Sequence, residues 1–164
     1  MGGSWRHAPS VEELMKALGI ATGYPAGNHS RPVVTCVLLE GSRSSPTVLD
    51  AFDLKTPGDD PMDQLQDLAR ALASKLSGLD IDAAIIRVAD RSPQANQSTT
   101  PRRRLLIEGA LALTCRDKTP HVLARSGREL GQDTGMSKAD LFGLAQTIDT
   151  GRPDAVAAAI SALA

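Results

Sequence analysis

Residues 33–54 have the sequence VVTCVLLEGSRSSPTVLDAFDL, and this stretch decides the fold class. Residues 33–39 form a β-branched apolar run, which is typical of a buried strand. Residues 41–46 contain Gly, Ser and Pro and predict a turn. Residues 47–54 alternate apolar and polar side chains, so they predict a second strand. Together these segments predict an antiparallel β-hairpin.

Helices and strands alternate after this hairpin. Asp60 followed by Pro61 predicts the start of a helix, and apolar residues continue at helical spacing as far as Leu76. Residues 83–89 (AAIIRVA) are typical of a parallel strand covered on both faces. The remaining predicted elements are a helix over about 101–115 capped by Thr100, a strand over 121–124, a helix capped by Ser137, and a last helix that begins at Pro153. This order predicts an α/β fold with a mixed sheet and helices on both faces.

The residues before the hairpin leave two alternatives open. Ser10 and Glu13 have capping-box spacing, and a helix after them would carry an apolar stripe of Val11, Leu14, Met15 and Leu18. The competing interpretation is a strand that ends at residues 19–20. We therefore divide the chain into an N-terminal extension, residues 1–32, which is a candidate to hold the first strand, and one domain over residues 33–164.

Composition excludes several classes of protein. Four residues are aromatic, namely Trp5, Tyr24, Phe52 and Phe142, and so few exclude an aromatic base-stacking surface. Cys36 and Cys115 form no CxxC motif, which excludes a zinc ribbon and predicts core thiols. We expect no membrane span and, since the N-terminus has no apolar signal core, a cytoplasmic protein.

Charge is balanced overall, at a formal net charge of −1, but it is divided along the chain. Residues 40–82 contain nine acidic and four basic residues, whereas residues 87–128 contain nine basic and three acidic residues. The basic part includes Arg102, Arg103 and Arg104, which are candidates to neutralise nucleic-acid phosphates. The alternative is a solvated face, or one that meets an acidic surface of a partner.

The order of elements resembles the RNase H-like fold, and several segments resemble the RuvC Holliday-junction resolvase family. Their order and spacing carry the resemblance, which covers about residues 33–164. The segments are residues 51–56 (AFDLKT), 82–87 (DAAIIR), 104–113 (RLLIEGALAL), 135–140 (GMSKAD) and 152–159 (RPDAVAAA).

This resemblance implies a site in which four carboxylates hold two Mg²⁺ ions, one on the opening strand, one at the end of the middle strand and two on the last helix. The chain departs from that pattern. If residues 19–23 (GIATG) are the opening motif, Ala21 takes the place of the first Asp. We prefer this placement because it keeps three strands before the first long helix. In the alternative, residues 33–40 are the opening strand and Glu40 stands at the metal loop.

Arg87 takes the place of the middle-strand Glu, and the first Asp position of the last helix falls at Gly151 or Arg152. Asp154 is the one clean match and the one metal-ligand candidate. At about 4 Å and an effective dielectric of 20, an Arg in such a site costs roughly 4 kcal/mol per unit of metal charge. We therefore expect no cofactor, and Mg²⁺ or Mn²⁺ only if displaced acids act with Asp154. Those weak candidates are Glu40, Asp82 and Asp90.

The favoured function is a non-catalytic nucleic-acid-binding or assembly module. The resemblance implies that Lys138 contacts a phosphate, and a buried Arg87 needs either a phosphate or Asp154 as its partner. Alternative functions are a divergent metal-dependent endonuclease and a protein-binding adaptor. We expect Glu108 to face solvent or to pair with an Arg. We also expect a homodimer or hetero-oligomer through the helix over 101–115, which carries Leu105, Leu106, Leu111 and Leu113.

Overall fold

The computed structural model describes residues 14–25, 31–90 and 99–164. In chain order the described elements are β1 (Lys16–Gly23), β2 (Val33–Ser42), β3 (Ser45–Lys55), α1 (Pro61–Ser77), β4 (Ala83–Arg87), α2 (Thr99–Arg116), β5 (Val122–Arg125), α3 (Gly127–Thr134), α4 (Lys138–Ile148) and α5 (Pro153–Ala162). Among these residues, no helix is long and apolar enough to cross a membrane.

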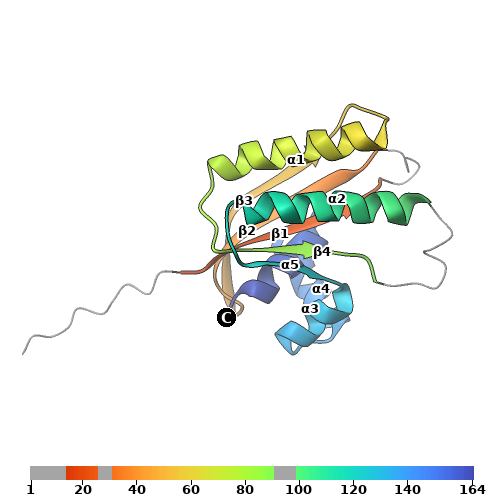
Figure 1. Ribbon diagram of the computed structural model, residues 1–164. Helices are drawn as coiled ribbons and strands as arrows, with labels where there is room; N and C mark the ends of the chain where they lie inside the picture. The colour runs from red at the N-terminus through yellow and green to blue at the C-terminus, as the bar shows by residue number, and fades with distance from the viewer. Residues whose placement is uncertain (1–13, 26–30, 91–98) are drawn as a thin grey trace, which may run out of the picture.

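The strands form one mixed sheet in the order β3-β2-β1-β4-β5 (Figure 1). β2 and β3 pair antiparallel, which confirms the predicted hairpin. β4 pairs in parallel with β1 on one side and β5 on the other, and all five of its residues are buried. The predicted parallel strand is therefore confirmed, although it ends at Arg87 rather than at residue 89.

The first strand of the sheet, β1, precedes residue 33 and lies at the centre of the sheet. The alternative of a helix that carries Leu18 on its apolar stripe is wrong, because Leu18 lies within β1; the Ser10 and Val11 part of that interpretation lies outside the described residues. Six consecutive residues of β1 are buried. A strand covered on both faces loses the alternation that distinguishes a strand from a helix in sequence.

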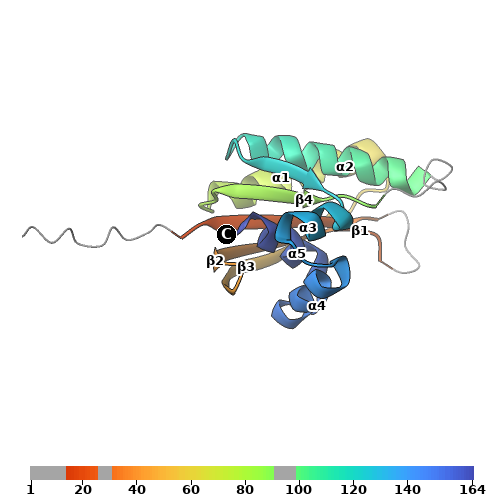
Figure 2. The same ribbon diagram turned by 90° about the horizontal axis from the view of Figure 1, so that it is seen from below.

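Helices cover both faces of the sheet, as predicted, with α1 and α2 on one face and α3, α4 and α5 on the other (Figure 2). The first face packs Leu, Ile, Val and Phe side chains and contains both free cysteines, which are buried as expected. The second face contains the small residues of α5. The caps predicted at Asp60 and Ser137 are confirmed, since each side chain accepts hydrogen bonds from backbone amides of its helix.

Helix α5 packs on β1 at backbone distance. A Cβ added to Gly19 would lie 1.8 Å from the carbonyl oxygen of Ala155 and 2.7 Å from the amide nitrogen of Ala159. The residues of α5 from Ala155 to Ile160 are fully buried. Glycine in the strand and alanine in the helix thus allow the start of α5 to lie directly on the sheet.

Candidate functional site

The positions that the resemblance assigns to metal-binding carboxylates do come together. Ala21 and Arg87 are Cα partners at the ends of the parallel strands β1 and β4. Ala21 and Asp154, at the start of α5, line the same pocket of about 250 Å³. Because β1 opens a set of three strands before α1, residues 19–23 lie on the opening strand, which agrees with the placement preferred from the sequence.

Arg87 is buried, with 7% of its surface exposed, and it points toward α3 and α4. Its Nη1 donates to the Val88 carbonyl oxygen, its Nη2 lies 3.5 Å from Oδ2 of Asp90, and its guanidinium lies 5.6 Å from the centre of the Phe142 ring. The alternative in which Arg87 pairs with Asp154 is not realised, because its carboxylate partner is Asp90. A buried guanidinium needs such a partner to offset its lost hydration.

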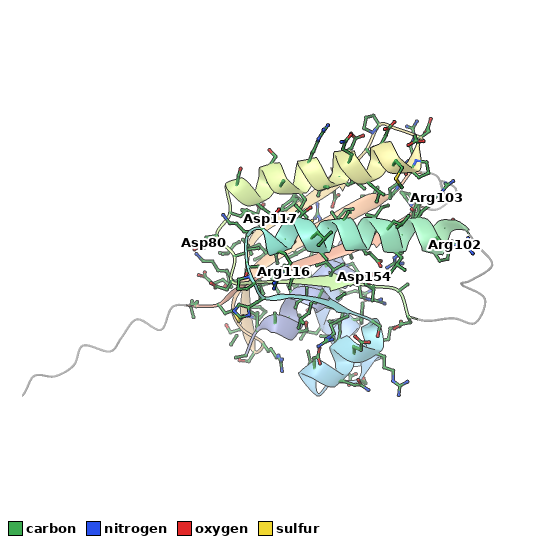
Figure 3. All side chains as sticks on the ribbon, viewed as in Figure 1. Asp80, Arg102, Arg103, Arg116, Asp117 and Asp154 are labelled. Atoms are coloured by element: carbon green, nitrogen blue, oxygen red, sulfur yellow. The ribbon has the colours of Figure 1, made fainter. Side chains whose placement is uncertain are left out.

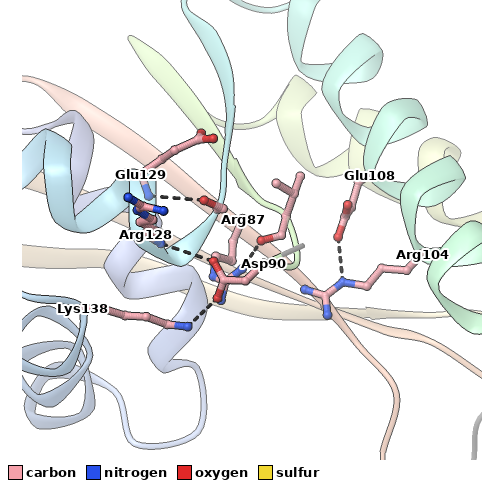
Figure 4. Close-up of polar contacts among 9 residues, drawn as sticks. Arg87, Asp90, Arg104, Glu108, Arg128, Glu129 and Lys138 are labelled. Atoms are coloured by element: carbon pink, nitrogen blue, oxygen red, sulfur yellow. Dashed lines mark hydrogen bonds and ion pairs between the residues drawn. The ribbon is translucent and has the colours of Figure 1, made fainter. Parts of the chain in front are cut away.

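Asp90 joins three elements through its carboxylate (Figure 4). It accepts hydrogen bonds from Nζ of Lys138, on α4, and from the backbone amide of Arg128, on α3, at 3.3 Å, in addition to its ion pair with Arg87. The hydrogen bond from Lys138, with smaller contributions from the Arg128 amide and the Arg87 charge, lowers the pKa of Asp90. The Asp90 carboxylate therefore binds Lys138, Arg87 and a backbone amide in this structure, rather than a metal ion.

A second arginine, Arg152, lies two residues before Asp154 in the sequence. Arg152 is the N-cap residue of α5, and it forms ion pairs with Asp53 at 2.9 Å and Asp149 at 3.2 Å. The hydrogen bond to Asp53 holds the pKa of Arg152 above its usual range. Asp154 itself is exposed, and the described part of the chain gives it no ion pair.

The residues present do not fit two Mg²⁺ ions. No group of three or more His, Cys, Asp or Glu side chains suited to a metal occurs within residues 14–25, 31–90 and 99–164. Glu40 is the Cα partner of Lys16, and Asp82 accepts the Lys16 amide at 2.8 Å. Both acids thus lie at the opposite end of β1, about 17 Å from Ala21 at ~3.3 Å per residue. Glu40 and Asp82 therefore lie too far from Asp154 to share a metal ion with it. Their interpretation as displaced metal ligands that act with Asp154 is wrong.

A groove of about 840 Å³ opens between the first half of α2, the ends of β4 and β5, and the start of α3. We call it the basic groove. Its charged lining residues are Arg102, Arg104, Arg128 and Lys138, with Asp90, Glu108 and Glu129. The structure therefore brings together three of the residues predicted to contact nucleic acid, Arg102, Arg104 and Lys138, and Arg87 lies against the groove through Asp90.

The three consecutive arginines of α2 have different environments. Arg102 is exposed and lines the basic groove at the end of α2 far from Arg116 (Figure 3). Arg104 pairs with Glu108 at 2.7 Å, so of the two alternatives for this acid the Arg pairing is confirmed, and the solvent-facing one is wrong because Glu108 is buried. Burial raises the pKa of Glu108, and the hydrogen bond from Arg104 opposes that shift. Arg103 does not line the groove and lies toward Tyr24.

Helix α3 and its groove residues, Arg128 and Glu129, were missed in the sequence. The helix has the sequence GRELGQDT, in which polar residues and two glycines hide any apolar stripe. One signal was present, since Ser126 and Glu129 have the spacing of a capping box. The Ser126 side chain does accept a hydrogen bond from the Glu129 amide, at 3.3 Å.

Solved structures share this architecture. The structure of T. thermophilus RuvC in complex with a Holliday junction substrate matches with a TM-score of 0.66 and 14% identity, covering 90% of this chain and 91% of that chain. A second Thermus thermophilus RuvC structure matches with a TM-score of 0.65 and 15% identity, covering 90% and 92%. No protein-family model and no curated protein matches the chain. The chain therefore has a RuvC-like, RNase H-like α/β fold.

Proposed function

We propose that this protein is a RuvC-like domain that binds nucleic acid without cleaving it. The observation that carries the proposal is the position of Arg87, which is buried and in register with Ala21 beside the start of α5. The resemblance assigns carboxylates to both strand positions. In this chain the two positions hold Ala21 and Arg87, which carry a methyl group and a guanidinium instead of carboxylates.

Electrostatics favours the loss of metal-dependent cleavage. Two divalent ions in a phosphodiester-cleaving site need several oxygen ligands around both metals. Asp154 offers one carboxylate, with Arg152 two residues before it and Arg87 on the neighbouring strand. A guanidinium cannot ligate a divalent metal, and its positive charge repels one at short range.

The basic groove supports the binding part of the proposal. Arg102 presents an exposed guanidinium there, and Lys138 and Arg128 approach from α4 and α3 on the other side. Guanidinium and ammonium groups bind phosphate oxygens through charge-assisted hydrogen bonds. The neighbouring RuvC structure with a Holliday junction substrate makes branched DNA the first ligand to test.

The decisive experiment incubates the protein with duplex, single-stranded and four-way DNA, with Mg²⁺ or Mn²⁺, and measures cleavage and binding separately. We expect binding whose affinity falls as salt rises, and no cleavage. Cleavage that needs the metal and disappears in Asp154→Asn would establish the divergent endonuclease instead. Absence of binding at low salt to every DNA and RNA tested would favour the protein-binding adaptor.

Assembly through α2 is the second part of the proposal, and one observation favours it. Leu106 is 53% exposed and Leu113 is 72% exposed on this helix. A Cβ added to Gly109, between them, would meet no atom of the described residues within 4 Å. Residues at i, i+3 and i+7 lie on one helix face, so a flat apolar strip is open to the same strip of a second copy.

A further inference from the structure

The carboxylate of Asp90 sits in a set of donors that is suited to a phosphate group. Its Oδ2 faces Nζ of Lys138 and Nη2 of Arg87, and its Oδ1 accepts the amide of Arg128 in the first turn of α3 (Figure 4). A guanidinium, an ammonium and a helix N-terminal amide together form the donor set that binds phosphate oxygens in proteins. In the free protein, the anion that these donors bind is the carboxylate of Asp90.

Two further observations show that this set is shaped for an anion. A Cβ added to Gly127 would lie 2.7 Å from Cε of Lys138 and 3.0 Å from Nη2 of Arg87, so glycine leaves the room in which the two cations converge on α3. Only 7% of the Arg87 surface is exposed, and within the described residues its Nε has no hydrogen-bond partner. Asp90 thus satisfies the buried guanidinium only in part.

We infer that Arg87, Lys138 and the start of α3 form a phosphate-binding site that Asp90 occupies in the free protein, and that a nucleic-acid phosphate displaces the Asp90 carboxylate from it. The inference rests on the proposed function for the identity of the ligand. It adds a regulatory contact, because a ligand must outcompete an internal anion before it reaches Arg87 and Lys138.

The position of Asp90 makes such an exchange feasible. Asp90 follows β4 by three residues and belongs to no helix or strand. Its side chain is 37% exposed and lines the basic groove, so it can turn outward without breaking the sheet. The exchange replaces one anion by another and leaves the buried Arg87 compensated in both states.

The test is Asp90→Asn in the full chain, with four-way DNA as the ligand. Because the site is then open to a phosphate, we expect binding about tenfold tighter than wild type, as one charge-assisted contact provides. The salt dependence should steepen by about 0.9 in log K against log salt, which is the value for one more phosphate of a duplex.

The matched control is Asp80→Asn, which makes the same charge change at an exposed residue that pairs with Lys16 at the opposite end of β1 and β4 (Figure 3). We expect its affinity and salt slope to equal those of wild type. If Asp90→Asn binds no more tightly than Asp80→Asn, the inference is overturned. Lys138→Gln added to Asp90→Asn should abolish the gain.

Inorganic phosphate gives a second measurement, which does not depend on DNA binding. We expect phosphate to raise the thermal unfolding midpoint of Asp90→Asn more than that of wild type, at constant ionic strength set with chloride. If Asp90→Asn fails to fold alone, phosphate should restore its cooperative unfolding, and failure of that rescue overturns the inference. Phosphate stabilisation without DNA binding would keep the site and refute the proposed function.

Discussion

Gly19 of β1 and Ala155 of α5 are in direct backbone contact, since a Cβ on the glycine would lie 1.8 Å from the alanine carbonyl oxygen. This contact sets how deeply the helix lies on the sheet. It also sets where Asp154, the residue before Ala155, stands relative to Ala21. The geometry of the candidate site therefore depends on the absence of one methyl group.

Gly19→Ala should destabilise the protein by about 1–3 kcal/mol or more, because the added methyl group meets rigid backbone rather than a side chain that can move. Urea unfolding followed by circular dichroism measures the effect. Gly23→Ala, where the new Cβ meets no atom within 4 Å in the part of the chain that the structure describes, is the matched control and should change stability little. Equal unfolding midpoints for the two variants would show that α5 shifts freely on the sheet.

Asp154→Asn should leave nucleic-acid affinity and unfolding nearly unchanged. The side chain is exposed and forms no ion pair within the described part of the chain, so its charge contributes little to either. Fluorescence anisotropy with labelled four-way DNA and a thermal melt measure both quantities. A large loss of affinity only in the presence of Mg²⁺ would contradict the reading of this site as metal-free.

Replacing Arg102 and Arg128, two exposed residues of the basic groove, together by Ala should flatten the salt dependence of nucleic-acid binding, by up to about 1.8 in log K against log salt for a duplex. Arg104 is kept, because its loss would leave the buried Glu108 without its ion-pair partner. Arg70→Ala combined with Lys118→Ala removes the same charge from exposed residues outside the basic groove and should not change the slope. If the two double variants had the same slope of log K against log salt, the nucleic-acid-binding surface would lie outside the basic groove.

Stability should fall on acidification through the titration of Asp90. Its pKa is lowered in the folded protein, chiefly by the hydrogen bond from Lys138, so its ionised form stabilises the fold above the pKa it has when unfolded. That contribution is lost as the pH falls through the lower, folded pKa. Asp90→Asn should have a shallower pH dependence of unfolding in this acidic range than Asp80→Asn. If the two variants had the same pH dependence of unfolding, the predicted contribution of ionised Asp90 to stability would be wrong.

Leu113→Glu should convert the proposed dimer into a monomer, because it places a charge on the exposed strip formed with Leu106 and Gly109. Sedimentation velocity at tens of micromolar measures the oligomeric state. Met62→Glu, at a residue of α1 that is 58% exposed, is the control and should leave the dimer intact. A wild-type monomer that associates with no other chain would refute assembly through α2.

Local patterns in the sequence were sufficient to predict most elements. The hairpin, α1 and α5 follow from β-branched runs, a Pro at a helix start and apolar spacing, all of which act over a few residues. β1 stayed ambiguous because its buried run fits a strand or a helix equally. α3 is not predictable from periodicity, because its glycines and polar residues give no apolar stripe, and the capping-box spacing at Ser126 is its one local signal.

The charge network around Asp90 was not predictable in this way. In the sequence, Asp90 is a weak candidate for a displaced metal ligand, and the resemblance implies that Lys138 contacts a phosphate. Their pairing joins residues 48 positions apart and depends on how α4 is placed against the end of β4. The resemblance assigns Ala21 and Arg87 to positions of one site, and their register as Cα partners comes from the structure.

The central place of β1 has a consequence for folding kinetics. Its parallel partner β4 begins 60 residues after the end of β1, at Ala83, and its covering helix α5 begins only at Pro153. Such pairings raise the contact order, and the entropy of loop closure must be overcome before they stabilise anything. We therefore expect folding on a timescale of about milliseconds to seconds. The amides of β1 should exchange with solvent only through global unfolding, as the slowest in the molecule.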